Sequence, residues 1–231
     1  MTAEWKNLIM ANFVIDPKVL EKYLPSGTEI DYFNGKTFVS VVGFLFANTK
    51  VRGLRIPFHI NFQEVNLRFY VRYKEQDIWK RGTVFISEIV PRAAITFVAN
   101  NIYHENYRTL PMKHFLKESD VIKTGYHWKF KGRWNKIEVT AGSTANAMIV
   151  DSEESFIAEH YWGYARFSKT VTYEYQVAHI PWMVYPVSDY LLECDFEGLY
   201  GPEFSLLKSQ QPSSVFLAKG SPVEVYKKRK L

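Results

Sequence analysis

The feature that most constrains this chain is a strictly alternating stretch at residues 64–73. Apolar side chains take the odd positions and mostly polar ones the even positions: Val65, Leu67, Phe69 and Val71 against Glu64, Asn66, Arg68, Tyr70 and Arg72. Successive side chains of a strand point to opposite faces of a sheet, so this stretch predicts a strand with one apolar face. At residues 58–62 the apolar residues are even-numbered instead, so one strand through both stretches would need a bulge or a bend near Gln63.

Other segments predict a mainly β (α+β) fold. Residues 38–46 are apolar nearly throughout, as expected of a central strand covered on both faces, and Asn34-Gly35 marks a hairpin turn just before them. Further strands are expected at residues 83–90, 94–99, 143–150, 170–178, 215–219 and 223–226, with a hairpin of residues 126–131 and 136–141. Short helices are expected at residues 16–24, 151–161 and 187–194, and a helix or an irregular crossing at residues 102–109.

Length and composition favour one domain over residues 1–231. This length suits one large β-rich domain or two small ones, but no linker, repeat or low-complexity stretch divides the sequence. The 17 Phe, 15 Tyr and 6 Trp residues favour strands and the walls of apolar cavities. We therefore predict a barrel-like, curled antiparallel sheet with a few short peripheral helices.

The positive charge of the chain is concentrated at its C-terminus. The net charge is +5, and four positive charges lie at Lys227, Lys228, Arg229 and Lys230. The rest of the chain is therefore near neutral, which argues against a nucleic-acid groove. We expect residues 227–231 to form a frayed basic tail, the alternative being weak attachment of this tail to anionic lipid or nucleic acid.

Cysteine usage and the lack of targeting segments favour a cytoplasmic protein. Cys194 is the only cysteine, so no intramolecular disulfide can form, and a reducing compartment fits best. The sequence has no secretory signal and no apolar run that reaches the ~20 residues of a membrane span.

No motif for a cofactor or a metal ion is evident in the sequence. The patterns G-x-G-x-x-G and G-x-S-x-G do not occur, and Gly35-Lys-Thr37 lacks the glycine that a phosphate loop has five positions earlier. None of the six histidines has H-x-H or H-E-x-x-H spacing, so a zinc site would need ligands gathered from distant loops. We predict neither a cofactor nor a metal ion. A metal-assisted lyase is the alternative, and elemental analysis of the purified protein tests it.

The polar row of Glu64, Asn66 and Arg68 has two interpretations. In the first, the row faces solvent, and Glu64 and Arg68 pair loosely, which contributes at most about 1 kcal/mol. In the second, the row lines a cavity, where a carboxylate and a guanidinium fix a polar ligand or order one another. The alternation alone favours the first interpretation, because it usually means that one face of a sheet is wet.

Several short motifs follow one another along most of the chain. They are Tyr23-Leu-Pro-Ser-Gly27, Phe38-Val-Ser-Val-Val-Gly-Phe44, Pro57-Phe-His59, Phe62-Gln-Glu-Val-Asn-Leu-Arg68, Tyr70-Val71, Ser155-Phe-Ile-Ala-Glu-His-Tyr161 and His179-Ile-Pro-Trp182. Their order resembles that of the YqjF-like family of bacterial proteins, and the core from Glu64 to Arg68 is the most specific of them. That family is similar to the acetoacetate decarboxylase superfamily. The resemblance implies a mostly β, barrel-like fold around a small-molecule cavity.

The resemblance also bears on the chemistry. Acetoacetate decarboxylase forms a Schiff base with a lysine whose pKa a neighbouring lysine lowers. The matching stretch here runs from Ala99 to Arg108, and it places Tyr107 at the nucleophilic lysine and Arg108 at its neighbour. A phenol cannot form an imine, so Schiff-base decarboxylation is not expected. Tyr107 can still form a hydrogen bond, and Arg108 can hold a carboxylate.

These residues together predict a site for a small organic anion such as a carboxylate. The expected ligand-binding residues are Glu64, Asn66, Arg68, Tyr107 and Arg108, with His59 at the mouth of the strand. If the protein is an enzyme, Glu64 and Tyr107 are expected to transfer protons, and an arginine to stabilise developing negative charge. The alternative is a non-catalytic structural or interaction protein whose own aromatic rings fill the core.

Overall fold

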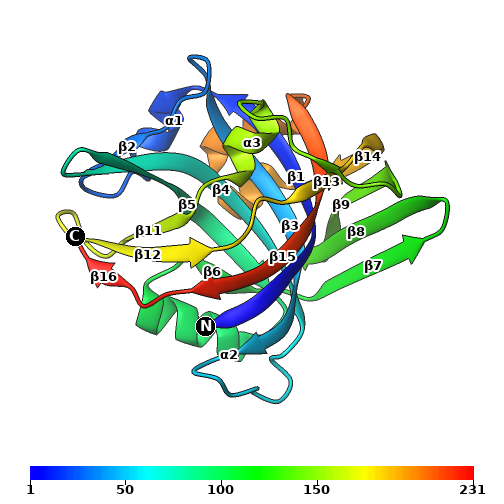
Figure 1. Cartoon of the computed structure of the whole chain (residues 1–231), viewed down its shortest axis with the longest axis horizontal. Coiled ribbons are helices and arrows are strands. Elements are labelled where there is room, and N and C mark those ends of the chain that lie inside the picture. The colour runs from blue at the N-terminus through cyan, green and yellow to red at the C-terminus, as the bar shows by residue number, and fades with distance from the viewer.

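Twelve strands form one curled sheet in the computed structural model, which covers residues 1–231 and describes every side chain except those of Ile102 and Tyr103 (Figure 1). These strands are β1 (Thr2–Ile15), β2 (Thr28–Ile30), β3 (Thr37–Lys50), β4 (Phe62–Glu75), β5 (Ile78–Val90), β6 (Tyr107–Thr109), β10 (Asn146–Ala147), β11 (Trp162–Arg166), β12 (Thr172–Ala178), β13 (Met183–Tyr185), β15 (Ser214–Val225) and β16 (Arg229–Lys230). Their order is β10-β13-β15-β1-β3-β4-β5-β11-β12-β16, with β2 beside β4 and β6 beside β5.

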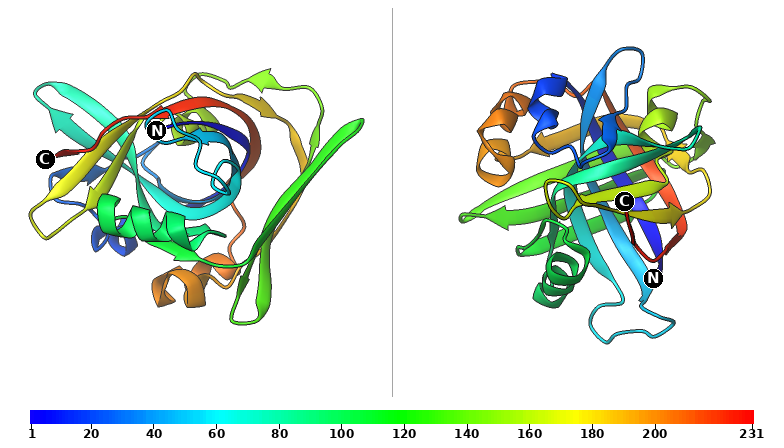
Figure 2. Two further views of the ribbon diagram at one scale, coloured as in Figure 1. Left: turned by 90° about the horizontal axis from the view of Figure 1, so that it is seen from below. Right: turned by 90° about the vertical axis from the view of Figure 1, so that its left-hand side faces the viewer.

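The sheet curls because strands far apart in its order come together. Strand β12 pairs with β15 as well as with β11 and β16, which gives the barrel-like outline seen end-on (Figure 2, left). Neighbouring strands are antiparallel except where β5 runs parallel to β6 and to β11. The predicted mainly β, barrel-like architecture is therefore confirmed.

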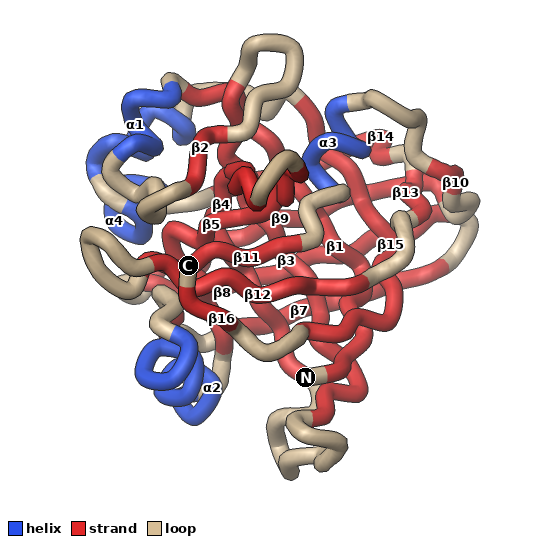
Figure 3. Tube along the Cα trace, turned by 60° about the vertical axis from the view of Figure 1, so that its left-hand side comes forward, coloured by secondary structure: helices blue, strands red, loops and turns tan.

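Four further strands form a second sheet on the outer side of the first (Figure 2, left). They are β7 (Met112–Glu118), β8 (Val121–Phe130), β9 (Arg133–Gly142) and β14 (Val187–Glu193), in the order β14-β9-β8-β7. Short helices lie at the periphery (Figure 3): α1 (Pro17–Glu21), α2 (Ala93–Val98), a π-helix (Ala99–Tyr103), α3 (Glu153–Ala158), α4 (Phe196–Tyr200) and a 3₁₀ helix (Pro202–Lys208). Among the described residues, none of these helices has the length and apolar character needed to cross a bilayer.

The odd-numbered residues of β4 hold the two sheets together. Val65, Leu67 and Phe69 are fully buried in one apolar cluster with Tyr126 and Ile137 of the second sheet. The sheets approach closely at Gly43 of β3, where a Cβ atom would lie 2.8 Å from the Tyr126 ring. The apolar face that the alternation predicts is thus the outer face of the curled sheet, covered by the second one.

Local signals placed several turns and caps correctly. Asn34 and Gly35 both have positive φ, 50° and 74°, as a tight hairpin turn requires. The Asp16 side chain accepts a hydrogen bond from Lys18 N and so caps α1, with Pro17 in the first turn. The hairpin predicted around residues 126–141 is β8–β9, with a turn at Lys131 and Gly132.

Other expected elements differ from the structure. Residues 94–99, expected as a strand, belong to α2 and the start of the π-helix, with Arg92 as the N-cap of α2. Residues 187–194, expected as a helix, form β14, because pairing with β9 outweighs local preference. Of residues 143–150 only β10 is a strand, and the two strands expected within residues 215–226 are the single strand β15. The helix expected from Asp151 begins one residue later, with Ser152 as its N-cap.

No single strand runs through the two stretches of opposite parity. Strand β4 begins at Phe62, so the even-numbered apolar residues before it belong to the connecting loop, and the condition for a bulge near Gln63 is not met. A register shift does occur between β4 and β5, where Leu67 faces Ser87 and Arg68 faces Phe85, leaving Ile86 as the extra residue. The sequence analysis did not predict this bulge in β5.

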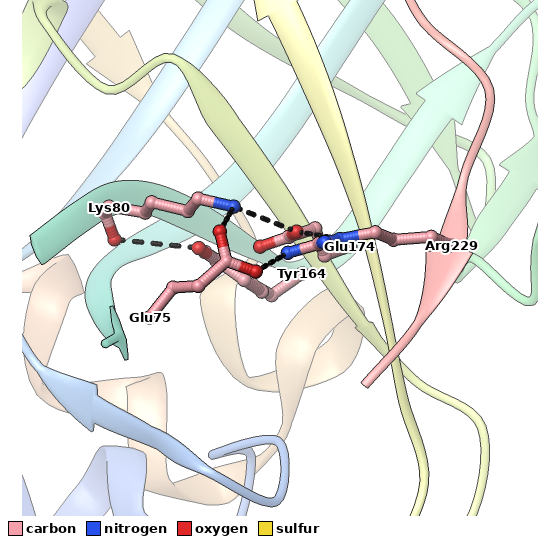
Figure 4. Close-up of polar contacts among 5 residues, drawn as sticks. All are labelled: Glu75, Lys80, Tyr164, Glu174 and Arg229. Carbon is pink, nitrogen blue, oxygen red and sulfur yellow. Dashed lines mark hydrogen bonds and ion pairs between the residues drawn. The ribbon is translucent and has the colours of Figure 1, made fainter. Parts of the chain in front are cut away.

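The basic C-terminus is not frayed at β16. Strand β16 pairs with Tyr173 and Glu174 of β12, and Arg229 Nε lies 2.5 Å from Glu174 Oε1 (Figure 4). Arg229 also forms an ion pair with Glu75, while Lys80 Nζ lies 3.2 Å from Glu174 Oε1. Because the Glu174 side chain is fully buried, these two cations compensate its charge.

Candidate functional site

The polar row of β4 points into the curled sheet. Glu64, Asn66 and Arg68 are only 2%, 1% and 7% exposed, so the interpretation of this row as a solvated face is wrong. Phe62 and Tyr70, on the same side of β4, belong to the apolar cluster that fills the interior. Curling encloses the inner face of the sheet, which carries the polar row, while the second sheet covers the outer face.

Aromatic rings close the interior on either side of this row. At one end the Phe62 ring stacks on Phe46 at 4.6 Å between centroids. At the other end the Tyr70 ring lies 5.8 Å from Phe156 of α3, edge to face. The three polar side chains therefore form a band between two apolar layers, where the local dielectric constant is low.

Tyr107 is brought to this band by an irregular segment. The π-helix is followed by its C-cap, His104, whose φ of 61° is unusual for a residue other than glycine. The Asn100 side chain then clamps the Tyr107 backbone, with Asn100 Nδ2 2.9 Å from Tyr107 O and Tyr107 N 2.7 Å from Asn100 Oδ1. In this position the Tyr107 hydroxyl donates to Glu64 Oε2 at 3.0 Å. Asn66 Nδ2 donates to the other oxygen, Glu64 Oε1, also at 3.0 Å.

Two further carboxyl groups lie in the same region, and the sequence analysis missed both. Glu88 of β5 is 3% exposed and sits in register between Asn66 of β4 and Tyr107 of β6. Glu105 follows His104 and receives a hydrogen bond from Tyr175 of β12. The signal for Glu88 was its place in a mostly apolar stretch, residues 85–90, in which it is the only charged residue, since charges are rare in buried strands.

Burial sets the protonation of these three carboxyl groups. It raises the pKa of Glu64 to about 7, against the opposing effects of Asn66, Tyr107 and the Arg68 charge. Burial likewise raises the pKa of Glu105 to about 7, and the charge of Glu64 adds to this. The pKa of Glu88 is raised further above its usual range by burial and by the negative charges of Glu105 and Glu64. At neutral pH the site therefore holds both protonated and ionised carboxyl groups.

The Arg68 guanidinium has no carboxylate partner among the described residues. Its nitrogens lie 3.4 Å from the Tyr70 hydroxyl, 3.5 Å from the Ile157 carbonyl and 3.9 Å from Met10 Sδ. Those contacts are long for hydrogen bonds and carry no full negative charge. A buried cation is normally paired, so this arrangement leaves Arg68 ready to receive an anion.

Two buried atoms of this region also lack hydrogen-bond partners. They are Asn66 Oδ1 and Glu88 Oε2, which belong to residues directly opposite each other in the β4–β5 register. Orphaned polar atoms in a buried region are rare in native proteins and each calls for an explanation. Binding a polar molecule in this band would supply one.

Clefts open next to the buried band. The larger, of about 500 Å³, is lined by Glu105, Tyr107 and Arg108 together with Ser87, Asn100 and Tyr200. The smaller, of about 170 Å³, shares Glu105 with it and reaches Tyr164. Glu105 and Tyr107 thus contact both a cleft and the carboxyl cluster, so this segment lies between the two.

Two residues of the expected site lie apart from the band. Arg108 follows Tyr107 on β6 and so points to the opposite face, where it is exposed in the larger cleft. His59 lies in the loop before β4, and its Nδ1 is 2.8 Å from the carbonyl of Pro57 in the same loop. The structure therefore joins Glu64, Asn66, Arg68 and Tyr107, but not Arg108 or His59. Among the described residues, no group of three or more His, Cys, Asp and Glu side chains is arranged to hold a metal ion.

Comparison with known proteins gives the sequence relationship. The model of the DUF2071 family, described as an uncharacterized conserved protein, matches residues 2–222. YqjF from Bacillus subtilis (strain 168), also described as uncharacterized, is 26% identical over 194 residues, which are 80% of this chain and 74% of YqjF.

Solved structures give the fold relationship. The enduracididine biosynthesis enzyme MppR, complexed with pyruvate, has a TM-score of 0.67 and 11% identity over 99% of this chain and 89% of its own. Acetoacetate decarboxylase from Legionella pneumophila has a TM-score of 0.63 and 13% identity over 98% and 87% of the two chains. At such low identity the likeness shows the fold alone. With nearly its whole length matched by the family model, the chain belongs to the DUF2071 family and has an acetoacetate decarboxylase-like fold.

Proposed function

We propose that this protein binds a small organic anion, a carboxylate, in the polar band of the curled sheet, with Arg68 as its counter-ion. The observation that carries this proposal is a guanidinium that is 7% exposed and has no ion-pair partner among the described residues. A ligand carboxylate would supply the missing charge through two parallel hydrogen bonds. Glu105 and Tyr107 line the larger cleft, and the ligand would pass these two side chains on its way from the cleft to Arg68.

The carboxyl groups around Arg68 suit a ligand with a second polar group. Burial and the charges of Glu105 and Glu64 raise the pKa of Glu88 well above its usual range, which favours the protonated form, and its hydroxyl could then donate a hydrogen bond to a carbonyl oxygen, as an ionised carboxylate cannot. Glu64, whose pKa is about 7, can give or take a proton near neutrality. The Tyr107 hydroxyl touches Glu64 and completes an acid–base pair. A Schiff base plays no part in this proposal, because Tyr107 stands where the resemblance places the lysine.

The fold relationship supports the choice of probe. MppR, which shares the fold, has been solved with pyruvate bound. We therefore suggest pyruvate, lactate, acetoacetate and benzoate as a first panel, since together they vary the group that accompanies a carboxylate.

A thermal-shift screen followed by calorimetry tests the proposal. A ligand present at ~100 times its Kd adds about 2.7 kcal/mol of stability, which raises Tm by about 5–10 °C in a domain of this size. We expect Arg68→Gln to abolish the shift, Arg68→Lys to retain part of it, and the exposed control Arg133→Gln to leave it unchanged. The proposal fails if no carboxylate raises Tm, or if folded Arg68→Gln responds like the wild type.

A second function has one observation in its favour. Rings fill both ends of the interior, through the Phe46–Phe62 stack and the Phe38, Tyr70 and Phe156 contacts. A structural or interaction protein with a self-filled core would look the same at those ends. The thermal-shift screen distinguishes the two functions, because the Tm of such a structural protein would show no Arg68-dependent rise with any carboxylate.

A further inference from the structure

A cationic and apolar loop projects from one end of the molecule. It connects β3 to β4, and residues 50–58, from the last residue of β3 onward and here called the 50–58 loop, are visible at the lower end of Figures 1 and 3. Three of its apolar side chains are largely in solvent: Leu54 is 71% exposed, Ile56 is 45% exposed and Phe58 is 83% exposed. Scattered apolar residues are common on protein surfaces, but three within five positions form a patch.

The backbone of the loop holds these side chains outward. Val51 and Leu54 exchange hydrogen bonds of 2.9 and 3.0 Å across a tight turn at Arg52 and Gly53, whose φ values are 52° and 82°. Phe58 has a φ of 65°, a left-handed conformation that is costly for an aromatic residue. The strain is not offset by burial of the Phe58 ring within this chain, so a contact outside the chain is the natural explanation for it.

The same loop is cationic. Lys50, Arg52 and Arg55 lie among the apolar residues, and no Asp or Glu occurs from residue 49 to residue 63. None of these three cations forms an ion pair within the described part of the chain. Helix α2 lies at the same end of the molecule (Figures 1 and 3). It adds Phe97, which is 67% exposed, and its N-cap residue Arg92 is exposed as well.

We propose that the 50–58 loop docks this end of the protein on an anionic lipid surface. Leu54, Ile56 and Phe58 would enter the boundary between headgroups and acyl chains, while Arg52 and Arg55 remain at the negative headgroups. A second copy of this chain fits the loop less well. A two-fold contact centred on the loop would place it against its own copy, which would bring like charges together. The C-terminal residues are a poorer lipid contact than their sequence suggested, because Arg229 is occupied by Glu75 and Glu174.

Vesicle flotation with the intact protein tests the proposal. The probes are phosphatidylcholine vesicles with and without about 30% phosphatidylserine, at low salt and at ~0.5 M salt, where screening acts within a few ångströms. We expect binding only to the anionic vesicles at low salt. We expect Leu54→Ser with Phe58→Ser to weaken binding at least ~10-fold, and Arg52→Gln with Arg55→Gln to weaken it by a factor of ~10–30. The control pair Ile149→Ser with Val150→Ser, at side chains 79% and 81% exposed elsewhere, should bind like the wild type.

Results of two kinds would overturn the proposal. One concerns the vesicles: the wild type does not bind anionic vesicles, or it binds them and the folded loop variants bind equally well. The other is self-association of the wild type in sedimentation velocity that Phe58→Ser abolishes, since the loop would then be covered by a second copy. Circular dichroism of each variant shows that the fold is retained, which is expected because all the altered side chains are largely exposed.

Discussion

Glu64 is the side chain on which the chemistry of the interior depends. It accepts hydrogen bonds from Tyr107 and Asn66 at 3.0 Å each, and its neighbours include Arg68 and two further carboxyl groups. Its pKa of about 7 results mainly from burial, which disfavours the charged form. A carboxyl group with this pKa gains or loses its proton with small changes of pH near neutrality, so both ligand binding and stability should depend on pH.

Glu64→Gln should change how stability varies with pH. The folded state holds a proton on Glu64 between the ordinary pKa of 4.5 and about 7, while the unfolded state does not. Glu64 therefore lowers stability as pH rises through this window. We expect the variant to have a Tm close to the wild type at pH 5 and higher by a few degrees, about 3–6 °C, at pH 8. The exposed control Glu118→Gln should differ from the wild type by the same Tm at every pH. If the Tm of Glu64→Gln also runs parallel to that of the wild type across this pH range, the burial account is contradicted.

His160 should stay neutral across the physiological range. Burial lowers its pKa to about 4, the charges of Arg81 and Arg68 add to this, and the contact of Nε2 with Asp31 at 3.2 Å opposes it. A lowered histidine pKa contributes stability at high pH that is lost as pH falls from 6.5 towards 4. Nitrogen-15 NMR should show a neutral ring with its proton on Nε2 from pH 5.5 to 8, assigned by its absence in His160→Gln. A titration of this signal within that range would show that the ring is solvated.

At the scale of single residues the sequence predicted part of the site. Glu64, Asn66, Arg68 and Tyr107 were identified and do come together. The alternation showed only that the faces of β4 differ, and not that the polar face is buried, because this depends on the curvature of the whole sheet. Glu105 could not be predicted as a partner, since it is brought in by a π-helix with no sequence signature.

At the scale of elements, local signals were reliable where the chain itself decides the structure. The turn at Asn34-Gly35 and the cap at Asp16 depend on backbone φ and on one side-chain oxygen, and both were predicted. Strand β14 and the C-terminal strand β16 depend on partners distant in the sequence, namely β9 and β12, and both were missed. Pairing of this kind is tertiary, so no local pattern reveals it.

Arg229→Ala should release β16 and destabilise the fold. The variant leaves the fully buried Glu174 with Lys80 as its remaining cation. Because Arg229 is itself half exposed, solvent screening reduces the loss to about 1–2 kcal/mol in urea unfolding. Adding Glu174→Gln should recover part of this loss, because no buried charge is then left underpaired. Lys227→Ala is the matched control, and an equal effect of both single variants would contradict the role of the ion pairs.

At the scale of the whole molecule, curvature decides what each face of the sheet does. The outer face carries the large apolar cluster shared with the second sheet, and the inner face carries the polar band and the rings on either side of it. The barrel-like class followed from strand count, aromatic content and the family resemblance. The separate four-stranded sheet could not be predicted from the sequence, because β14 pairs with β9 although about 45 residues of chain lie between them.

A crystal of the wild type soaked in pyruvate tests the central claim most directly. We predict difference density for the pyruvate carboxylate within hydrogen-bond distance of the Arg68 guanidinium, with its carbonyl oxygen directed towards Glu88 or Tyr107. The same soak of Arg68→Gln should show no such density. Two results would contradict the claim. One is density confined to the larger cleft at Arg108. The other is an interior that shows no ligand density at a pyruvate concentration that saturates binding in solution.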